Sequence, residues 1–366
     1  MRIGILSMQR VHNYGSFLQS YALKKILENM GHNVVFVDIE CTNYQSVAKQ
    51  KDVFSRMLGK FKYLDKYLFK RIQYSKKNTQ LNQVFLDVQK RYLDITEEKC
   101  TAGGCDAVVV GSDEIFNCEP NSKWGVTGQR FGDIKGVFIV FSYAASCGYT
   151  QAKDVSHDDA EVIAKALQKM KVISVRDNNT ADFVEFFSGK IPEMNLDPVL
   201  IYDFKEELNI GLYEGVPNYA YMAVYAYHNR IENGEEIKAI KAYAKKHRLK
   251  TIAIGGSLPW CDEFAIISPF QVLAYFKKAK CVVTDTFHGT IIAAKYNKPL
   301  AVLIRDSNAN KLGDLLERID IKNHCVTDIF TIDKVLDAVD YNNCNEIVKQ
   351  EQKHAIAYLD SIINNE

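Results

Sequence analysis

The sequence predicts an α/β protein built from two Rossmann-like domains, each with a parallel sheet covered by helices on both faces. Short apolar runs alternate with helical patterns along most of the chain, and this alternation is typical of parallel sheets. The 366 residues exceed one hydrophobic core, which favours two domains of roughly 150–200 residues. The alternation stops over residues 202–217, a polar stretch with glycine and proline, and then restarts. This stretch is the predicted linker.

The predicted N-terminal domain, residues 1–205, opens with a strand, a helix and a second strand. The helix has an apolar face from Phe17 to Leu27 and stops at Gly31, a residue that suits a helix C-terminus. A basic, aromatic helical insertion is expected at about 43–95. The apolar runs and helical periodicity predict strands over 2–7, 34–39, 107–110, 137–141, 172–175 and near Met194, and helices over 158–170 and 179–187.

The predicted C-terminal domain, residues 206–345, repeats the alternation, and residues 346–366 are predicted to form a final helix. In such sheets ligands bind beyond the carboxyl ends of the strands, so the site is expected in a cleft between the domains. The expected strands cover 219–225, 251–254, 281–283 and 300–304, and the expected helices cover 232–246, 269–279, 289–296, 311–318 and 332–339.

Composition excludes several classes of protein. The 46 basic and 45 acidic residues give a net charge of +1, so the chain as a whole lacks the excess of positive charge that is typical of nucleic-acid-binding proteins. No window is long and apolar enough to span a bilayer, and the N-terminus lacks a signal-peptide cleavage pattern. The nine cysteines show no metal-ligand spacing, which favours reduced, packed thiols and predicts no metal site.

The charge is unevenly distributed along the chain. Residues 46–91 carry twelve Lys or Arg against three Asp, a local charge of +9 that leaves −8 for the rest. The segment is either a solvated helical face above an aromatic core stripe, or a basic surface. Such a surface would hold an anionic acceptor or contact anionic lipid headgroups. The sequence leaves both alternatives open.

Five polar loops follow apolar strands and should lie on the rims of the two sheets. The first lacks the G-x-G-x-x-G dinucleotide fingerprint. Its Gly15 precedes a helix whose N-terminus could bind an anion, although Asn13 or Ser16 could simply cap the turn. Ser112 and Asp113 could likewise cap a helix or contact a ligand. The loops read "MQRVHNYGSFLQS", "VVVGSDEIFN", "FSYAASCG", "SVRDN" and "VVTDTFHGT".

Two of these loops carry residues suited to an anionic substrate. Arg176 ends a strand beside Asp177, where it could form an internal salt bridge or hold a carboxylate or phosphate. His288 lies on the first turn of a helix, after Asp285 and before Gly289. Helix amides there could hold phosphate while the imidazole transfers a proton, because an imidazole can serve as either acid or base. Thr284, Thr286 and Thr290 add short donors and acceptors.

In this order, the loops resemble those of the polysaccharide pyruvyl transferase family. "NYGSFLQSYAL" is similar to that family's N-Y-G-A-x-L-Q-x-Y-A-L, and "VVVGSDEIFN" to its G-S-D-Q-x-W-N. The likeness continues in register through "SYAASCG", "ISVRD", "LDPVLIYD", "VVTDTFHGTIIA" and "NKLGDLLERIDI", the last similar to N-x-R-I-x-x-L-L. It covers most of the chain and implies a GT-B-like arrangement of the two domains.

The resemblance also implies an activity. The enzyme would transfer the pyruvyl group of phosphoenolpyruvate onto two hydroxyls of a sugar as a ketal and release phosphate, with no cofactor. The acceptor would be a polysaccharide or its lipid-linked precursor, met at the cytoplasmic face of the inner membrane. The protein is therefore expected in the cytoplasm, with peripheral membrane contact.

By the same likeness, His288 would be the acid or phosphate ligand and Arg176 would hold an anionic end of the donor, with Asp285 as the third catalytic candidate. The donor would bind the C-terminal domain and the acceptor the N-terminal one. The expected donor-binding residues are Thr286, Gly289, Thr290, Asn310 and Lys311. The expected acceptor or cleft residues are Asn13, Tyr14, Gly15, Ser112, Asp113, Asn117, Ser142 and Tyr143.

The chain departs from the family pattern in four places. Thr286 stands where many members have an Arg two residues before the His, Lys311 stands where Arg is common, and Glu114 and Phe116 replace Gln and Trp. With Thr286 in place of Arg, the chain lacks a guanidinium group that could form two hydrogen bonds to the donor. Either the donor differs, or another cation compensates. The candidates are Lys295, Lys298, Arg305 and Lys311.

Two other functions stay open. One is a GT-B-type glycosyltransferase that uses a nucleotide-sugar. The C-terminal domain has no obvious acidic pair placed to bind a ribose, which argues against this function. The other is a non-catalytic binding member of a glycan-assembly complex, which the Thr286 substitution supports.

Overall fold

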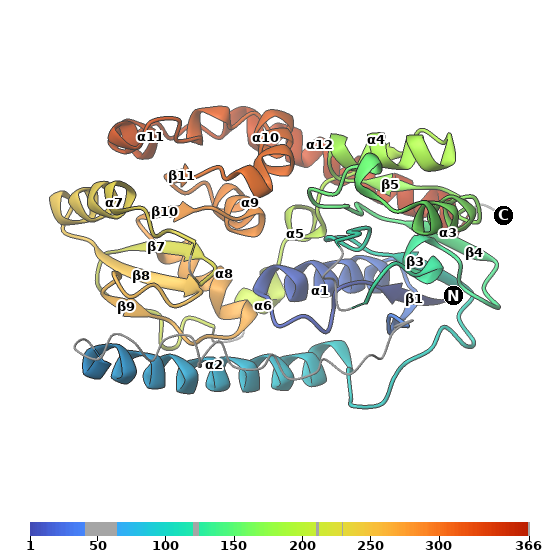
Figure 1. Cartoon of the computed structure of the whole chain (residues 1–366), viewed down its shortest axis with the longest axis horizontal. Coiled ribbons are helices and arrows are strands. Elements are labelled where there is room, and N and C mark those ends of the chain that lie inside the picture. The colour runs from blue at the N-terminus through green and yellow to red at the C-terminus, as the bar shows by residue number, and fades with distance from the viewer. Residues whose placement is uncertain (41–63, 120–123, 210–211, 229, 365–366) are drawn as a thin grey trace.

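The computed structural model describes residues 1–40, 64–119, 124–209, 212–228 and 230–364. Two parallel sheets lie side by side along the long axis of the molecule, each flanked by helices (Figure 1). We call the first sheet with its helices the N-terminal half and the second sheet with its helices the C-terminal half.

The first sheet has the strand order β2-β1-β3-β4, with all pairs parallel. A short parallel pair, β5 and β6, continues from it through bridges at Ala145. All six strands were predicted, and β3 has the predicted ends. The strands are β1 (Arg2–Leu6), β2 (Asn33–Val37), β3 (Ala107–Val110), β4 (Ile139–Ser142), β5 (Ser174–Val175) and β6 (Glu193–Met194).

Capping side chains determine where helices of the N-terminal half begin. The Asn13 side chain accepts bonds from the amides of Gly15 and Ser16 at the start of α1, and Asp177 accepts one from Thr180 at the start of α4. Such caps satisfy amides that the helix itself leaves unpaired. The helices are α1 (Tyr14–Asn29), α2 (Leu64–Leu93), α3 (His157–Leu167), α4 (Asn178–Ser188) and α5 (Pro198–Ile201), with 3-10 turns at Gly128–Phe131 and Ala152–Asp154.

The second sheet has the order β11-β10-β7-β8-β9, again with all pairs parallel. Four of its strands were predicted, whereas the two-residue edge strand β9 was not. The strands are β7 (Tyr221–Ala226), β8 (Lys250–Gly255), β9 (Glu263–Phe264), β10 (Cys281–Thr284) and β11 (Leu300–Val302).

The helices of the C-terminal half follow the predicted alternation, and the predicted linker contains the short helix α6. A capping box between Ser268 and Gln271, with Pro269 as the first helical residue, starts α8. The helices are α6 (Lys205–Asn209), α7 (Gly234–Lys246), α8 (Pro269–Lys278), α9 (Phe287–Lys295), α10 (Ala309–Arg318) and α11 (Ile332–Asp337), with 3-10 turns at Asp306–Asn308, Lys322–His324 and Ile329–Thr331.

The final helix, α12 (Asn342–Ile363), returns to the N-terminal half (Figure 1). Its Tyr358 hydroxyl donates to the carbonyl of Ser142 at 2.8 Å, and the Lys171 ammonium donates to the carbonyl of Ile362 at 3.3 Å. The chain therefore passes from the N-terminal half to the C-terminal half before β7 and returns along α12.

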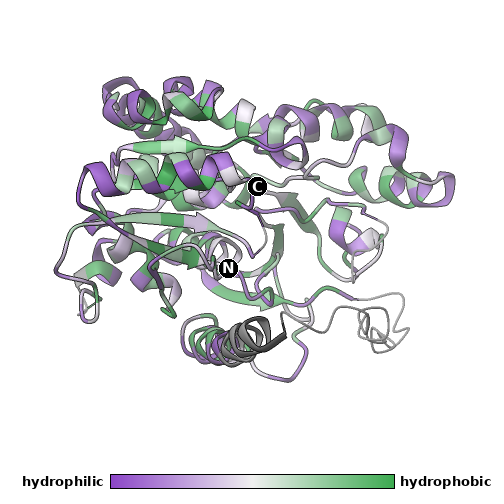
Figure 2. Cartoon of the chain, turned by 60° about the vertical axis from the view of Figure 1, so that its left-hand side comes forward, coloured by the Kyte–Doolittle hydropathy of each residue, from purple (hydrophilic) through white to green (hydrophobic). Residues whose placement is uncertain are grey.

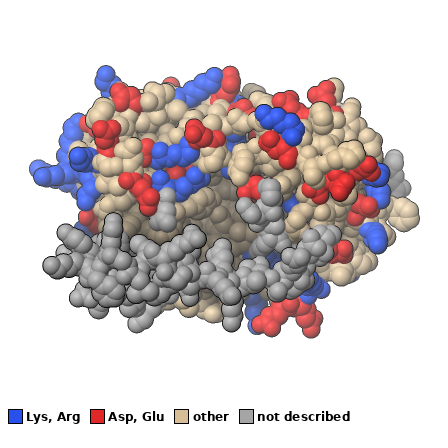
Figure 3. Space-filling view, in the orientation of Figure 1, with Lys and Arg blue, Asp and Glu red and all other residues tan. Residues whose placement is uncertain are grey.

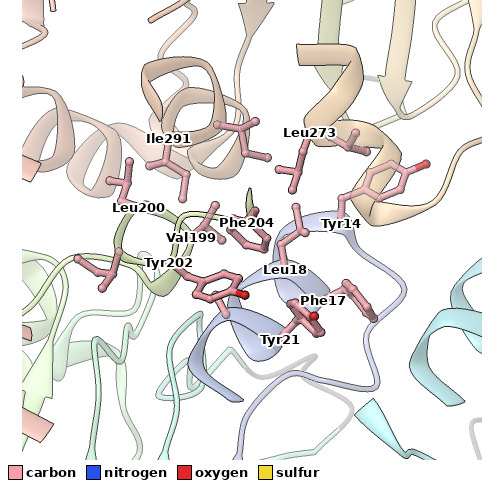
Figure 4. Packing of buried hydrophobic residues seen from close by; sticks show 14 of the residues in the cluster. Tyr14, Phe17, Leu18, Tyr21, Val199, Leu200, Tyr202, Phe204, Leu273 and Ile291 are labelled. Atoms are coloured by element: carbon pink, nitrogen blue, oxygen red, sulfur yellow. The ribbon is translucent and has the colours of Figure 1, made fainter. Parts of the chain in front are cut away.

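Apolar packing joins the two halves. The largest buried cluster contains residues of α1 and α5 together with Leu273 of α8 and Ile291 of α9 (Figure 4). Tyr21 and Phe270 meet edge to face at 4.8 Å between ring centroids. Each half also has its own cluster on the other face of its sheet, and Figure 2 shows the hydrophobic strands inside the more polar helices. The shared core sets how the strand ends of the two halves face each other.

The long helix α2 runs beneath both halves (Figure 1). Its C-terminal part packs on α1 through Phe85, Val88 and Leu93, while the Lys77 ammonium lies 5.6 Å from the centroid of the Phe264 ring. Residues 41–63 lie outside the described part, so the basic-surface prediction for 46–91 stays a prediction.

Two further findings concern only the described residues. None of their helices is long and apolar enough to cross a membrane. Their eight cysteines are all free, which agrees with the expected thiols. The ninth, Cys41, lies outside the described residues.

Candidate functional site

The strand-exit loops of the two sheets meet between the halves, in a region that we call the seam. The loop before α1 and the exits of β3 and β5 come from the N-terminal half, and the exits of β7, β10 and β11 from the C-terminal half. Polar contacts between the described residues of the two halves include Asn13 to Tyr227 at 2.9 Å, Tyr14 to the Ile267 carbonyl at 2.9 Å, Lys311 to Glu114 at 2.5 Å, and the Asn178 amide to Asp314 at 2.8 Å.

The start of α9 places His288 at the seam. Thr286 caps the helix by accepting the Gly289 amide at 2.9 Å, and its carbonyl accepts the hydroxyl of Thr290 at 2.9 Å. A Cβ on Gly289 would lie 2.2 Å from the Thr284 hydroxyl oxygen, so only glycine fits this turn. The hydroxyls of Thr286 and Thr290 and the Gly289 amide are thus engaged in forming the helix start.

The His288 imidazole lies against Gly15 of the opposite half. A Cβ on Gly15 would fall 2.0 Å from Nδ1 of His288. The His288 side chain is only 5% exposed, and its Nε2, which lacks a hydrogen-bond partner, lies 3.6 Å from Oδ2 of Asp197. The imidazole is therefore buried between the halves, whereas the sequence predicted a residue lining an open cleft. A ligand reaches it only when the seam opens.

This contact predicts the effect of Gly15→Ala. The added methyl group has to displace the imidazole or part the halves, so we expect a loss of about 1–3 kcal/mol in unfolding free energy. The control is Gly313→Ala within α10, where a Cβ meets nothing within 4 Å and should stabilise the helix slightly. Urea unfolding measures both variants. A neutral Gly15→Ala would mean that the imidazole does not rest on Gly15 in solution.

Arg176 forms the internal salt bridge that the sequence left as one alternative. Its side chain is 2% exposed, its Nη1 donates to Oδ2 of Asp197 at 2.7 Å, and its Nη2 lies 3.4 Å from Oδ1 of Asp113. The guanidinium also lies 4.2 Å from the centroid of the Phe287 ring. Burial opposes the charge, but Asp113 and Asp197 outweigh it and raise the pKa of Arg176. In this arrangement Arg176 orients carboxylates.

Asp197 links Arg176 to His288. It caps α5 by accepting the Val199 amide at 3.0 Å and accepts the Ser112 hydroxyl at 3.1 Å. Burial by itself would raise its pKa, but His288 and Arg176 lower the pKa of Asp197 to about 2. Asp197 belongs to the "LDPVLIYD" segment, but no role was predicted for it from the sequence.

The lowered pKa of Asp197 predicts a pH dependence. A carboxylate with a folded-state pKa of about 2, below its ordinary 3.8, contributes stability above pH 3.8 and loses it as the pH falls toward 2. The difference in unfolding free energy between wild type and Asp197→Asn should therefore shrink by about 1 kcal/mol from pH 5 to pH 3. Urea titrations at both pH values measure it. A difference that stays constant would show that Asp197 has no lowered pKa.

The other residues predicted for the site lie at different depths. Asp113 accepts the Ser16 hydroxyl at 2.6 Å and has a φ of 71°, a conformation that costs a non-glycine residue energy. Asn117 donates to Glu114 at 2.9 Å. Ser142 and Tyr143 are buried, and their hydroxyls donate to the carbonyls of Ser174 and Leu196. On α10, Asn310 is exposed, while Lys311 pairs with Glu114.

A second cluster of charged side chains lies at the exits of β7, β10 and β11. Asp285 is 0% exposed, and the Nε atoms of Arg230 and Arg305 lie 3.7 and 3.6 Å from its Oδ2. Neither carboxylate oxygen has a hydrogen-bond partner. Burial raises the pKa of Asp285, although the two arginines oppose the rise.

Of the four cations expected to replace the family's Arg, only Arg305 lies beside Asp285. Lys295 donates to the carbonyls of Leu200 and Tyr202, Lys311 pairs with Glu114, and Lys298 precedes β11 at the amino end of that strand. Arg230 was not predicted from the sequence, because it follows the end of β7 by four residues in a turn without a recognisable motif.

The arrangement combines a buried imidazole, a carboxyl with a raised pKa and two guanidinium groups, which suits proton transfer on an anionic substrate. Within the described ranges, no group of three His, Cys, Asp or Glu side chains is placed to hold a metal ion.

Comparisons with known proteins agree with this organisation. A family model described as polysaccharide pyruvyl transferase matches residues 13–307, and no curated protein matches the chain. Among solved structures, UDP-N-acetylglucosamine 2-epimerases are similar in fold. The one from Neisseria meningitidis, bound to UDP-GlcNAc, has a TM-score of 0.52, 10% identity and 100% coverage of both chains. The one from Methanocaldococcus jannaschii has a TM-score of 0.51, 11% identity and coverage of 98% of this chain and 99% of that one. The predicted GT-B-like arrangement is confirmed.

Proposed function

Because the chain belongs to the polysaccharide pyruvyl transferase family, we propose that it transfers the pyruvyl group of phosphoenolpyruvate onto two hydroxyls of a sugar. The product is a cyclic ketal, and phosphate is released. The acceptor is a polysaccharide or its lipid-linked precursor, which the protein meets in the cytoplasm, peripheral to the membrane. The observation that carries the proposal is the position of His288, from the "TDTFHGT" segment, where the strand exits of both halves meet.

The reaction defines what the site has to do. The methylene carbon of phosphoenolpyruvate gains a proton and becomes a methyl group, and two sugar oxygens bond to the neighbouring carbon. The bond from that carbon to the phosphate oxygen breaks. Of the two hydroxyl protons, one balances the methyl group and the other leaves with the phosphate. The site thus needs proton transfer and cations for an anionic donor.

His288 supplies the proton transfer in this proposal. An imidazole can act as a general base or a general acid, so it accepts a proton from a sugar hydroxyl or gives one to the departing phosphate. Asp197 and Arg176 act as positioning residues, because Arg176 holds Asp197 at 2.7 Å and Asp197 faces His288. The reactants enter when the halves separate around the imidazole, and closure around them excludes water.

Phosphate release from phosphoenolpyruvate tests the proposal across a panel of nucleotide-linked and lipid-linked sugars. We expect release that depends on one acceptor, with a new methyl signal in the product by NMR and one phosphate for each ketal. Consumption of a nucleotide-sugar instead would establish the glycosyltransferase alternative. Acceptor binding without turnover of either donor would establish the non-catalytic alternative.

A further inference from the structure

We propose that Arg230, Arg305 and Asp285 form the subsite for a phosphomonoester. When the phosphoryl group binds, the two arginines pair with it instead of with Asp285, and Asp285 takes up a proton. The inference rests on the proposed function for the identity of the donor. The cluster itself is a feature of this chain, built from the exits of three neighbouring strands, β7, β10 and β11.

The contacts of Asp285 are incomplete in the present arrangement. Both guanidinium Nε atoms approach the same oxygen, Oδ2, at 3.7 and 3.6 Å, beyond hydrogen-bond distance. Both oxygens of Asp285 and Nε of Arg305 lack hydrogen-bond partners. A buried carboxylate without hydrogen bonds is costly. The two arginines therefore lie near a carboxylate that accepts a hydrogen bond from neither of them.

The guanidinium groups are already oriented by other contacts. Arg305 donates two bonds to Glu236 at 2.6 and 2.8 Å, and Arg230 donates to the Ser307 hydroxyl at 3.0 Å. These bonds leave the Nε of each arginine directed at Asp285. A phosphate oxygen accepts such charge-assisted bonds well, and a pre-oriented guanidinium loses little entropy on binding.

The subsite can be reached from the surface. The Arg230 and Arg305 side chains are 32% and 24% exposed, so they extend from the buried carboxyl group toward solvent. The surface is hollowed between the two halves, and Lys and Arg side chains gather beside this hollow on the C-terminal half (Figure 3).

The same cluster accounts for Thr286. In this chain its hydroxyl serves as the cap of α9, so the helix start provides no guanidinium. Arg230 and Arg305 supply two from the adjacent strand exits instead.

Charge balance makes the binding proton-linked. The groups that face Asp285 are Arg230 and Arg305, with Glu236 behind Arg305 and Tyr227 nearby. With Asp285 and Glu236 ionised, the two arginines are neutralised. A dianion that takes the arginines leaves Asp285 buried without a cation, and the carboxyl group then takes up a proton. A protonated carboxyl beside the donor is suited to protonate its methylene carbon.

Calorimetric titration with inorganic phosphate tests the subsite. Arg230→Gln should weaken phosphate binding between about tenfold and a hundredfold, because it removes a charge-assisted hydrogen bond. The control is Arg248→Gln, an exposed residue that follows α7 at the amino end of β8 and should leave binding unchanged. Equal phosphate affinity in the two variants would overturn the proposal.

Asp285→Asn tests the proton exchange. The isosteric amide frees the arginines, so this variant should bind phosphate at least as tightly as wild type. Titration in two buffers of different ionisation enthalpy should show less proton uptake for it than for wild type. A loss of phosphate affinity, or unchanged proton uptake, would show that Asp285 only holds the fold.

Different experimental results would contradict the proposed subsite and the proposed function. If Arg230→Gln weakens phosphate binding but phosphoenolpyruvate is never consumed, the subsite stands and the proposed function is wrong. If pyruvyl transfer occurs and Arg230→Gln keeps the wild-type KM for phosphoenolpyruvate, the function stands and the subsite is wrong.

Discussion

Replacing His288 by alanine should abolish phosphate release from phosphoenolpyruvate while the protein stays folded. In the proposed function the imidazole is the general acid–base group, and such groups contribute roughly 10²- to 10⁴-fold to rate. The lost ring contact with Gly15 should lower the melting temperature only modestly. Phosphate release and thermal unfolding, measured on the same preparation, separate the two effects.

His324 provides the matched control. It is also a buried histidine of the C-terminal half, but it stacks on Tyr341 at 4.8 Å and its Nδ1 lies 3.0 Å from the Leu300 carbonyl oxygen. His324→Ala should lower stability and leave the specific activity of the folded fraction intact. Full activity in His288→Ala, or its complete unfolding, would assign His288 a structural role and favour the non-catalytic alternative.

Replacing Arg176 by glutamine should cost about 3–5 kcal/mol of unfolding free energy, the usual effect of removing one partner from a buried ion pair. The variant leaves Asp197 buried without its 2.7 Å partner, and Asp113 without its cation at 3.4 Å. Urea unfolding at neutral pH measures the loss.

The double variant Arg176→Gln/Asp197→Asn shows whether the pair is the cause. Because it removes both charges, it should recover part of the stability that Arg176→Gln loses, with a coupling energy above about 1 kcal/mol. If Arg176→Gln lies within about 1 kcal/mol of wild type, the guanidinium is not an internal structural cation. It would then be free to hold the donor, as the family resemblance implies.

Most of the fold could be predicted because its strands are continuous apolar runs. The all-buried "AVVV" of β3 and "CVVT" of β10 are typical of strands covered on both faces. The two-residue strand β9 offers no such run. The helical pattern of α12 was evident, but its return to the N-terminal half depends on long-range contacts such as Tyr358 with Ser142, which no local pattern encodes.

The site was predicted in part for the same reason. Asp285 directly follows β10, and Gly15 and His288 lie on the first turns of α1 and α9, whose starts were recognisable from the sequence. Gly15 and His288 come into contact. Arg230 lies beyond its strand in a turn, and only the strand order β11-β10-β7 brings it beside Asp285. Burial of the imidazole could not be predicted either, because it depends on how the two halves meet.

Binding of phosphoenolpyruvate is the most direct test of the claim that the seam holds a small donor with two anionic groups. Calorimetry should show phosphoenolpyruvate binding to the wild-type protein, weakened in Arg230→Gln and unchanged in Arg248→Gln, with no comparable binding of UDP-sugars. Binding of a UDP-sugar in place of phosphoenolpyruvate would contradict the account.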